Sequence, residues 1–109
     1  MMYSLTYYIP LSDHARVKQA LFDSGAGKIG QYDECCWELL GNGQFRPQNG
    51  SNPLVGQTGK LEQLAEYKVE MVCADEKIRE VVETLLREHP YEQPAYFINQ
   101  VMTRDDLLK

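Results

Sequence analysis

The chain has 109 residues, with 11 Lys plus Arg against 16 Asp plus Glu and a formal net charge of -5. This is the length of one ordinary domain, so we expect a single domain over residues 1–109. The 43% hydrophobic and 25% charged fractions are typical of a globular protein and exclude a disordered chain. Acidic charge with scattered basic residues excludes nucleic acid as the expected partner. No stretch approaches the roughly 20 apolar residues of a membrane span, so no membrane partner is expected.

The N-terminal ten residues and the cysteines indicate the compartment. The N-terminus has no basic region, long apolar run or small-residue cleavage site, and therefore does not resemble a signal peptide. The three cysteines are an odd number, and two of them, Cys35 and Cys36, are adjacent and cannot easily pair with each other. We therefore expect a reduced, cytoplasmic protein.

The first 25 residues predict a strand followed by a helix. Residues 3–9 alternate apolar and polar side chains, the period of a half-buried strand, and Pro10 ends it. Ser12 is a candidate N-cap, and Gly25 is the expected stop of the helix. The stripe that this helix should bury has helical spacing: Val17, Ala20, Leu21 and Ser24.

The middle of the chain predicts a second strand and a long loop. We expect the strand to run from about Tyr32 to Leu40, with a hairpin turn at residues 41–43 because Gly-Asn-Gly tolerates positive φ. A short return strand over residues 44–47 should follow. Residues 48–59 are rich in Gly, Asn and Pro, which indicates an irregular loop.

The remaining elements repeat the first pair. Alternation over residues 67–73 predicts a strand, and Asp75 is a candidate helix N-cap. The helix should end before His89, with its apolar stripe at Ile78, Val81, Val82, Leu85 and Leu86. A last strand over residues 95–101 and a polar tail with one helical turn complete the chain.

The element order is typical of an α+β, ferredoxin-like (split β-α-β) sandwich, with an extra β-hairpin and a long Gly-rich loop. Such a fold places both helices on one face of an antiparallel sheet and leaves the other face uncovered. Aromatic side chains in the strands indicate that this face packs against something, and a second subunit is the expected cover.

Two glycine patterns resemble nucleotide motifs but lack their context. Residues 25–30 match G-x-G-x-x-G, yet these glycines follow a helix, whereas a dinucleotide fingerprint follows a strand and opens a helix. We therefore interpret them as a helix-stop turn. Residues 56–60 are too short for a Walker motif, and Leu61 replaces the hydroxyl that binds Mg²⁺.

The most unusual stretch is residues 89–94, His-Pro-Tyr-Glu-Gln-Pro. His89 can interact with the last carbonyls of the preceding helix, and two prolines fix the entry into the final strand. This stretch is a rigid connector, and it also holds Tyr91 and Glu92 in a fixed position suitable for recognition. No base is placed beside a Ser or Cys nucleophile, so we expect no catalytic residue and no cofactor.

Several motifs together resemble the middle domain of the Nif-three-like (NGG-interacting factor three, YqfO-type) proteins, over nearly the whole chain from Tyr3 to Val101. The residues that carry the resemblance are Ile29-Gly30-x-Tyr32, Gly41-x-Gly43-x-Phe45-x-Pro47, Asn52-Pro53-x-x-Gly56 and His89-Pro90-Tyr91-Glu92. CutA-like proteins also resemble the chain at this last motif.

The resemblance implies a PII- and CutA-like fold, an oligomer (trimer or dimer) and ligands bound in clefts between subunits. In the full-length family this segment is inserted into a two-metal-binding core, and we expect none of that core within these 109 residues. The cyclohydrolase-like activity attributed to the family is therefore not expected here.

Two functional hypotheses follow, and an enzyme stays a third class that would need a nucleophile the sequence does not identify. The first is a non-catalytic, PII-like regulatory module that binds a small ligand or a partner protein through Tyr32, Cys36, Trp37, His89, Tyr91 and Glu92. The alternative is a CutA-like copper- or zinc-binding protein that uses Cys35 or Cys36 with His89 and Glu38, because thiolate and imidazole suit these metals. The first hypothesis assigns no metal ligands, and it treats His14 as a solvated residue and the strand cysteines as core.

Overall fold

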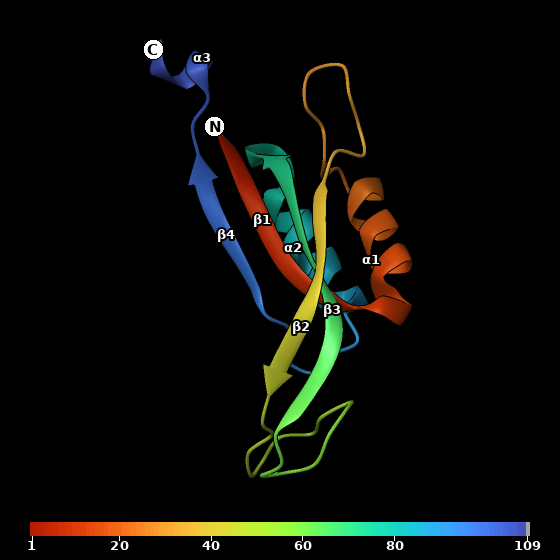
Figure 1. Cartoon of the computed structure of the whole chain (residues 1–109). Helices are drawn as coiled ribbons and strands as arrows, with labels where there is room; N and C mark the ends of the chain where they lie inside the picture. The colour runs from red at the N-terminus through yellow and green to blue at the C-terminus, as the bar shows by residue number, and fades with distance from the viewer. Residues whose placement is uncertain (109) are drawn as a thin grey trace.

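The computed structural model describes residues 1–108. Seven elements follow one another along the chain: β1 (Met2–Pro10), α1 (Leu11–Asp23), β2 (Trp37–Phe45), β3 (Glu62–Ala74), α2 (Asp75–Glu88), β4 (Tyr96–Val101) and α3 (Arg104–Leu107). Four strands form one sheet in the order β2-β3-β1-β4, and every neighbouring pair is antiparallel. Helices α1 and α2 pack on one face of this sheet, with α2 behind the strands in Figure 1. The expected ferredoxin-like architecture is confirmed.

The core lies between the helices and one face of the sheet. Alternate residues of β1 and β3 point into it, which explains the period of two in these segments. Each helix contributes an apolar stripe with helical spacing. The buried apolar residues are Leu5, Tyr7, Ile9, Val17, Leu21, Ala26, Val69, Met71, Cys73, Val81 and Leu85.

The helix boundaries differ slightly from the expected ones. Helix α1 begins directly after Pro10, which is its N-cap residue, so the proposed cap at Ser12 is wrong. Asp75 is likewise the first residue of α2 rather than its cap. Each carboxylate in these first turns still lies where the helix dipole favours an anion. The expected stop at Gly25 is confirmed, with a φ of 116° that favours glycine.

The largest difference between the structure and the sequence prediction lies in β2. Residues 41–43 are not a hairpin turn: they lie in the middle of β2 and pair with Glu66, Ala65 and Leu64 of β3. The strand starts later than expected because the segment before it folds back on itself. In that segment Ile29 pairs with Tyr32, and the Cys35 N–H donates to the Gly27 carbonyl at 2.8 Å.

Strands β2 and β3 therefore form one long hairpin, closed by the loop of residues 46–61. This hairpin extends beyond the helices at the lower end of the molecule, and the loop lies at its tip (Figure 1). The chain is accordingly elongated, with principal extents of 51 × 24 × 23 Å. The expected Gly-rich loop is present, and the long strand β3 begins five residues earlier than its alternation predicted.

The first residue of β1 and the last residue of β4 lie side by side at one end of the sheet. Met2 of β1 pairs with Val101 of β4, and the N-terminal ammonium lies 3.5 Å from Asp75 Oδ2. The expected helical turn in the tail is α3, capped by Thr103 and Asp106.

Within residues 1–108, none of the helices has the length and apolar character needed to cross a membrane.

The burial pattern of α2 predicts that two neighbouring leucines contribute very differently to the stability of the fold. Leu85 is fully buried, whereas Leu86 is 41% exposed. Leu85→Ala should lower the free energy of unfolding by about 2–5 kcal/mol, because it removes buried methyl groups and leaves a cavity. Leu86→Ala should cost less than about 1 kcal/mol. Urea unfolding of both variants measures the difference, and equal losses would contradict this description of the core.

Candidate functional site

A pocket of about 560 Å³ lies on the open face of the sheet, at the end where the long hairpin extends. The open face carries the side chains that alternate with the core residues, including Tyr8 of β1, Leu39 of β2 and Lys68 of β3. The loop of residues 46–61 and the turn of residues 91–95 form the other walls. The pocket is therefore built from three parts of the chain that are distant in sequence: β1, the β2–β3 hairpin with its loop, and the turn of residues 91–95.

The floor of the pocket is formed by two glycines of β2. Gly41 and Gly43 lie on the open face, and a side chain at either position would occupy space above the strand. A Cβ on Gly41 would meet no other atom within 4 Å, whereas a Cβ on Gly43 would overlap with the carboxylate of Glu66. Glycine at position 43 thus lets Glu66 lie across the strand.

Tyr91 is anchored to the sheet by Glu66. The Tyr91 hydroxyl donates to Glu66 Oε2 at 2.8 Å, and the Tyr91 ring lies 6.5 Å from the ring of Phe45, centroid to centroid. Burial raises the pKa of Tyr91 well above its usual value, and the bond to the Glu66 carboxylate raises it further. Tyr91 is therefore a neutral hydrogen-bond donor at physiological pH.

His89 lies beneath Tyr91 and fixes the turn to β1. The Tyr91 N–H donates to His89 Nδ1 at 3.1 Å, so the other ring nitrogen carries the proton, and this Nε2 lies 2.6 Å from the Tyr8 carbonyl oxygen. Only 5% of His89 is exposed. Burial lowers the pKa of His89, although the bond to the Tyr8 carbonyl opposes this shift. The imidazole is a neutral structural link with both nitrogens engaged.

Glu92 connects the turn to the long loop. The backbone N–H of Asn52 donates to Glu92 Oε1 at 3.0 Å across 40 residues of sequence. The apolar lining completes the walls on both sides of this link, with Leu39, Phe45, Pro53, Leu54 and Val55. A mostly apolar cavity with a few fixed polar groups is the usual character of a small-molecule site.

A second polar cluster lies on the helix side of the sheet, around Glu38. Its Oε1 accepts a hydrogen bond from Lys18 Nζ at 2.7 Å and lies 3.1 Å from His14 Nε2. The bond from Lys18 lowers the pKa of Glu38. Cys36 Sγ lies 3.9 Å from the same oxygen, and burial raises the pKa of this thiol. The buried hydroxyl of Tyr7 has no hydrogen-bond partner among residues 1–108.

This cluster corrects two expectations. His14 is not solvated: 7% of it is exposed, and its ring stacks on Tyr67 with centroids 4.2 Å apart. The signal was present, because His14 stands three and seven residues before Val17 and Leu21 on the buried stripe of α1. Of the cysteines, only Cys73 is a core residue, since Cys36 is exposed and Cys35 is half-buried outside the strand.

The structure separates the six residues that the sequence suggested as ligand-binding. Tyr91 and Glu92 line the pocket, and His89 supports them from beneath. Cys36 contacts Glu38 on the helix side of the sheet. Trp37 lies on the open face at the beginning of β2, outside the lining of the pocket, and Tyr32 is 75% exposed in the segment between α1 and β2.

Other lining residues were missed by sequence reasoning. These are Tyr8, Gly41, Gly43, Phe45, Glu66 and Lys68. A usable signal was the alternation of Gly41, Gly43 and Phe45, which places all three on one face of a strand. It was overlooked because the same glycines were interpreted as a turn.

The metal hypothesis relied on Cys35 or Cys36 meeting His89 and Glu38 at one point. The structure instead places His89 against Tyr8 and Tyr91, while Cys36 contacts Glu38 beside α1. Throughout residues 1–108, no three His, Cys, Asp or Glu side chains form a group that could hold a metal ion.

Comparison with known proteins supports the resemblance to Nif-three-like proteins. No family model matches the chain. The protein named GTP cyclohydrolase 1 type 2 homolog of Mycobacterium leprae is 43% identical over 91 residues, which are 84% of this chain and 24% of that protein. The protein of the same name from Bacillus subtilis is 36% identical over 97 residues, 89% of this chain and 26% of its own length. The chain thus spans about a quarter of these relatives.

Solved structures agree with this result. A Bacillus cereus protein related to NIF3 superposes with a TM-score of 0.80 at 31% identity, covering 94% of this chain and 26% of its own. CutA from Xylella fastidiosa gives a TM-score of 0.69 at 19% identity and covers 98% of this chain and 90% of its own, which shows a shared fold. The chain is therefore homologous to a segment of the Nif-three-like proteins and has the CutA-like fold.

The buried, neutral state of His89 predicts a decline in stability at mildly acidic pH. The folded-state pKa lies below the usual value near 6.5, so below that pH the unfolded chain binds a proton that the folded protein excludes. The free energy of unfolding should therefore fall between pH 7.5 and 5.5, with a contribution from His89 of at most about 1.4 kcal/mol per pH unit.

Urea unfolding across this range measures the slope, and His89→Asn provides the comparison. The variant should be less stable at pH 7.5, because the Tyr8 carbonyl loses its donor, and its pH dependence should be flatter. An unchanged slope in His89→Asn would assign the dependence to other groups.

Proposed function

We propose that the chain is a non-catalytic, regulatory module that binds a small molecule in the open-face pocket. The observation that carries the proposal is the floor of the pocket: Gly41 leaves open space above β2, and Gly43 makes room for the Glu66 carboxylate. A volume of about 560 Å³ falls within the usual range of small-molecule sites.

The polar groups of the pocket favour binding over catalysis. Tyr91 is held neutral and already donates to Glu66, and both nitrogens of His89 are engaged by backbone groups. A general base needs a free lone pair within reach of substrate, which this arrangement does not offer at His89. The relatives named as cyclohydrolase homologues are about four times as long, so that activity is not extended to this chain.

Filling the pocket floor tests this proposal. Gly41→Leu should leave the fold intact, because its Cβ meets no neighbour and its backbone has no positive φ, while its side chain occupies the cavity. In a thermal-shift screen of drug-sized metabolites, a ligand that binds only the folded state should raise the melting temperature of the original protein by several degrees. Gly41→Leu should abolish that shift.

Asn99→Leu is the matched control, since it adds the same side chain to the open face of β4, outside the pocket lining. It should retain the ligand-induced shift. A hit that stabilises Gly41→Leu as strongly as the original protein would place binding elsewhere.

We also propose that the module works as a homo-oligomer through the part of the open face next to the pocket. One row across the sheet reads Trp37, Glu70, Thr6 and Phe97 in register. The aromatic residues at its two ends are 70% and 59% exposed. Large exposed aromatics on an uncovered sheet face mark an interaction surface, and a second copy presents the same row.

Charges in this row should dissociate the oligomer. Trp37→Glu combined with Phe97→Glu is expected to shift the mass measured by light scattering at micromolar concentration toward the monomer, because it desolvates carboxylates at an apolar contact. Ile29→Glu, an exposed apolar residue outside the sheet, is the control and should leave the mass unchanged. A monomeric original protein would overturn this part of the proposal.

The three cysteines support a reducing setting. All are free thiols, and Cys36 is exposed. We therefore propose that the module is located in the cytoplasm.

A further inference from the structure

We propose that the ligand of the open-face pocket is an organic cation, an ammonium group attached to an apolar or aromatic body. This inference rests on the proposed binding function and names the chemical class that the pocket selects. It follows from the charges and the rings that face the cavity.

Two carboxylates in the pocket wall have no compensating cation. Glu66 accepts from the hydroxyl of Tyr91, and Glu92 accepts from the backbone N–H of Asn52, so both known donors are neutral. Among the described residues, no lysine, arginine or histidine lies within ion-pair distance of either carboxylate. Neither carboxylate is therefore paired with a protein cation. Glu66 is half-buried at the apolar cavity, where a ligand cation is attracted more strongly, whereas the attraction of exposed Glu92 is weakened by solvent.

The one cation in the lining does not cancel this charge. Lys68 Nζ lies 3.9 Å from Glu70 Oε1, and 45% of its side chain is exposed. Its charge is therefore shared with a carboxylate outside the pocket lining and screened by solvent. The lining has two carboxylates against one lysine, and its net charge favours a cationic ligand over an anionic one.

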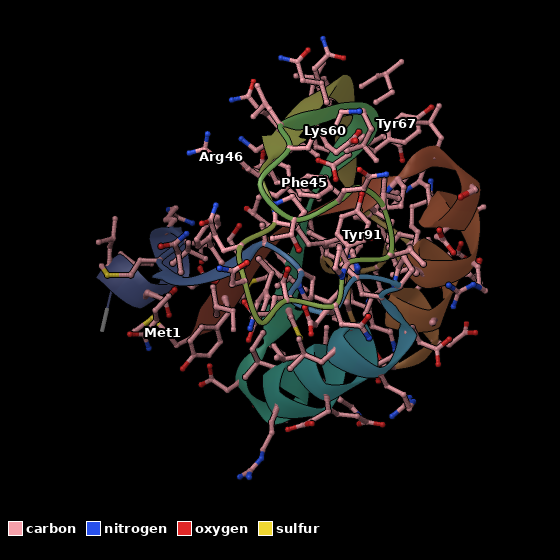
Figure 2. All side chains as sticks on the ribbon, turned by 90° about the horizontal axis from the view of Figure 1, so that it is seen from below. Met1, Phe45, Arg46, Lys60, Tyr67 and Tyr91 are labelled. Atoms are coloured by element: carbon pink, nitrogen blue, oxygen red, sulfur yellow. The ribbon has the colours of Figure 1, made fainter. Side chains whose placement is uncertain are left out.

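Aromatic rings supply the second half of the site. Phe45 and Tyr91 are tilted by 48° with their centroids 6.5 Å apart, and Tyr8 lines the same cavity. Figure 2, which views the molecule along the long hairpin, shows Phe45 and Tyr91 within the outline of the loop. Rings that face a cavity attract ammonium groups through their negative faces. Glu66 holds the hydroxyl of Tyr91 and His89 holds its backbone N–H, so the ring has a fixed position in the wall.

The apolar walls define the rest of the ligand. Leu39, Leu54 and Val55 face the same cavity, and the volume of about 560 Å³ is far larger than an ammonium group requires. A ligand that fits must therefore carry an apolar or aromatic body, which these side chains contact while the carboxylates and rings bind its cation.

Three small probes with the same ring and side-chain length separate the possible classes: 2-phenylethylamine, 2-phenylethanol and 3-phenylpropionate. Saturation-transfer NMR at pH 7 and low salt measures the affinity of each for the full chain. We expect the amine to bind at least about tenfold more tightly than the neutral alcohol, as a charge-assisted hydrogen bond to carboxylate implies. The propionate should bind more weakly than the alcohol.

Isosteric variants assign the preference to the carboxylates. Glu66→Gln and Glu92→Gln each retain an acceptor oxygen, for Tyr91 and for Asn52 respectively, and remove the charge. Each should lower the affinity for the amine several-fold while leaving that for the alcohol unchanged. Glu83→Gln, on the exposed side of α2, is the matched control and should change neither.

The outcomes distinguish this inference from the function on which it rests. Equal binding of amine and alcohol, or tighter binding of propionate, overturns the cation class but leaves the pocket as a binding site, provided that Gly41→Leu blocks the probe that binds. Amine binding that survives Gly41→Leu overturns the inference, because the cation then lies elsewhere. If none of the probes binds, both the cation class and the pocket proposal fail for ligands of this type.

Discussion

The antiparallel ladder between β2 and β3 is the interaction on which the rest of the molecule depends. It pairs nine residues of β2 with β3, and its register places Gly41 opposite Glu66 and Leu39 opposite Lys68. Because side chains alternate across a strand, a shift by one residue would move both glycines to the helix side and carry Glu38 away from Lys18. The same ladder thus determines the pocket on one face and the polar cluster on the other.

His89 has a comparable role at the other wall of the pocket. A connector rich in proline can fix its own backbone angles, but it cannot fix its distance from the sheet. The imidazole does this, because it bonds to the β1 backbone at Tyr8 and to the turn at Tyr91. Hydrogen bonds therefore hold the aromatic wall against the sheet, and Glu92 links the same turn to the loop through Asn52.

Sequence reasoning recovered the elements whose local pattern agrees with their environment. Residues 3–9 alternate because one side is core, and α2 shows a clean stripe, so both were predictable. Residues 41–43 were misread because Gly-Asn-Gly has the chemistry of a turn, and only pairing with a distant strand makes it extended. The pocket was partly predicted, at Tyr91 and Glu92, because a rigid corner is visible in sequence. Glu66 and Tyr8 were missed, since nothing local indicates which strand residues lie beside the turn: Glu66 is 25 positions from Tyr91, and Tyr8 is 81 positions from His89.

The pairing of Met2 with Val101 has a consequence for how this fold is used in longer proteins. The first and last strands are antiparallel neighbours, and their outer ends meet at the end of the sheet opposite the long hairpin (Figure 1). A host chain could enter and leave through this one point, as if the whole domain were a single surface loop. Such a unit needs only two adjacent peptide junctions, and its pocket lies toward the opposite end of the sheet from them.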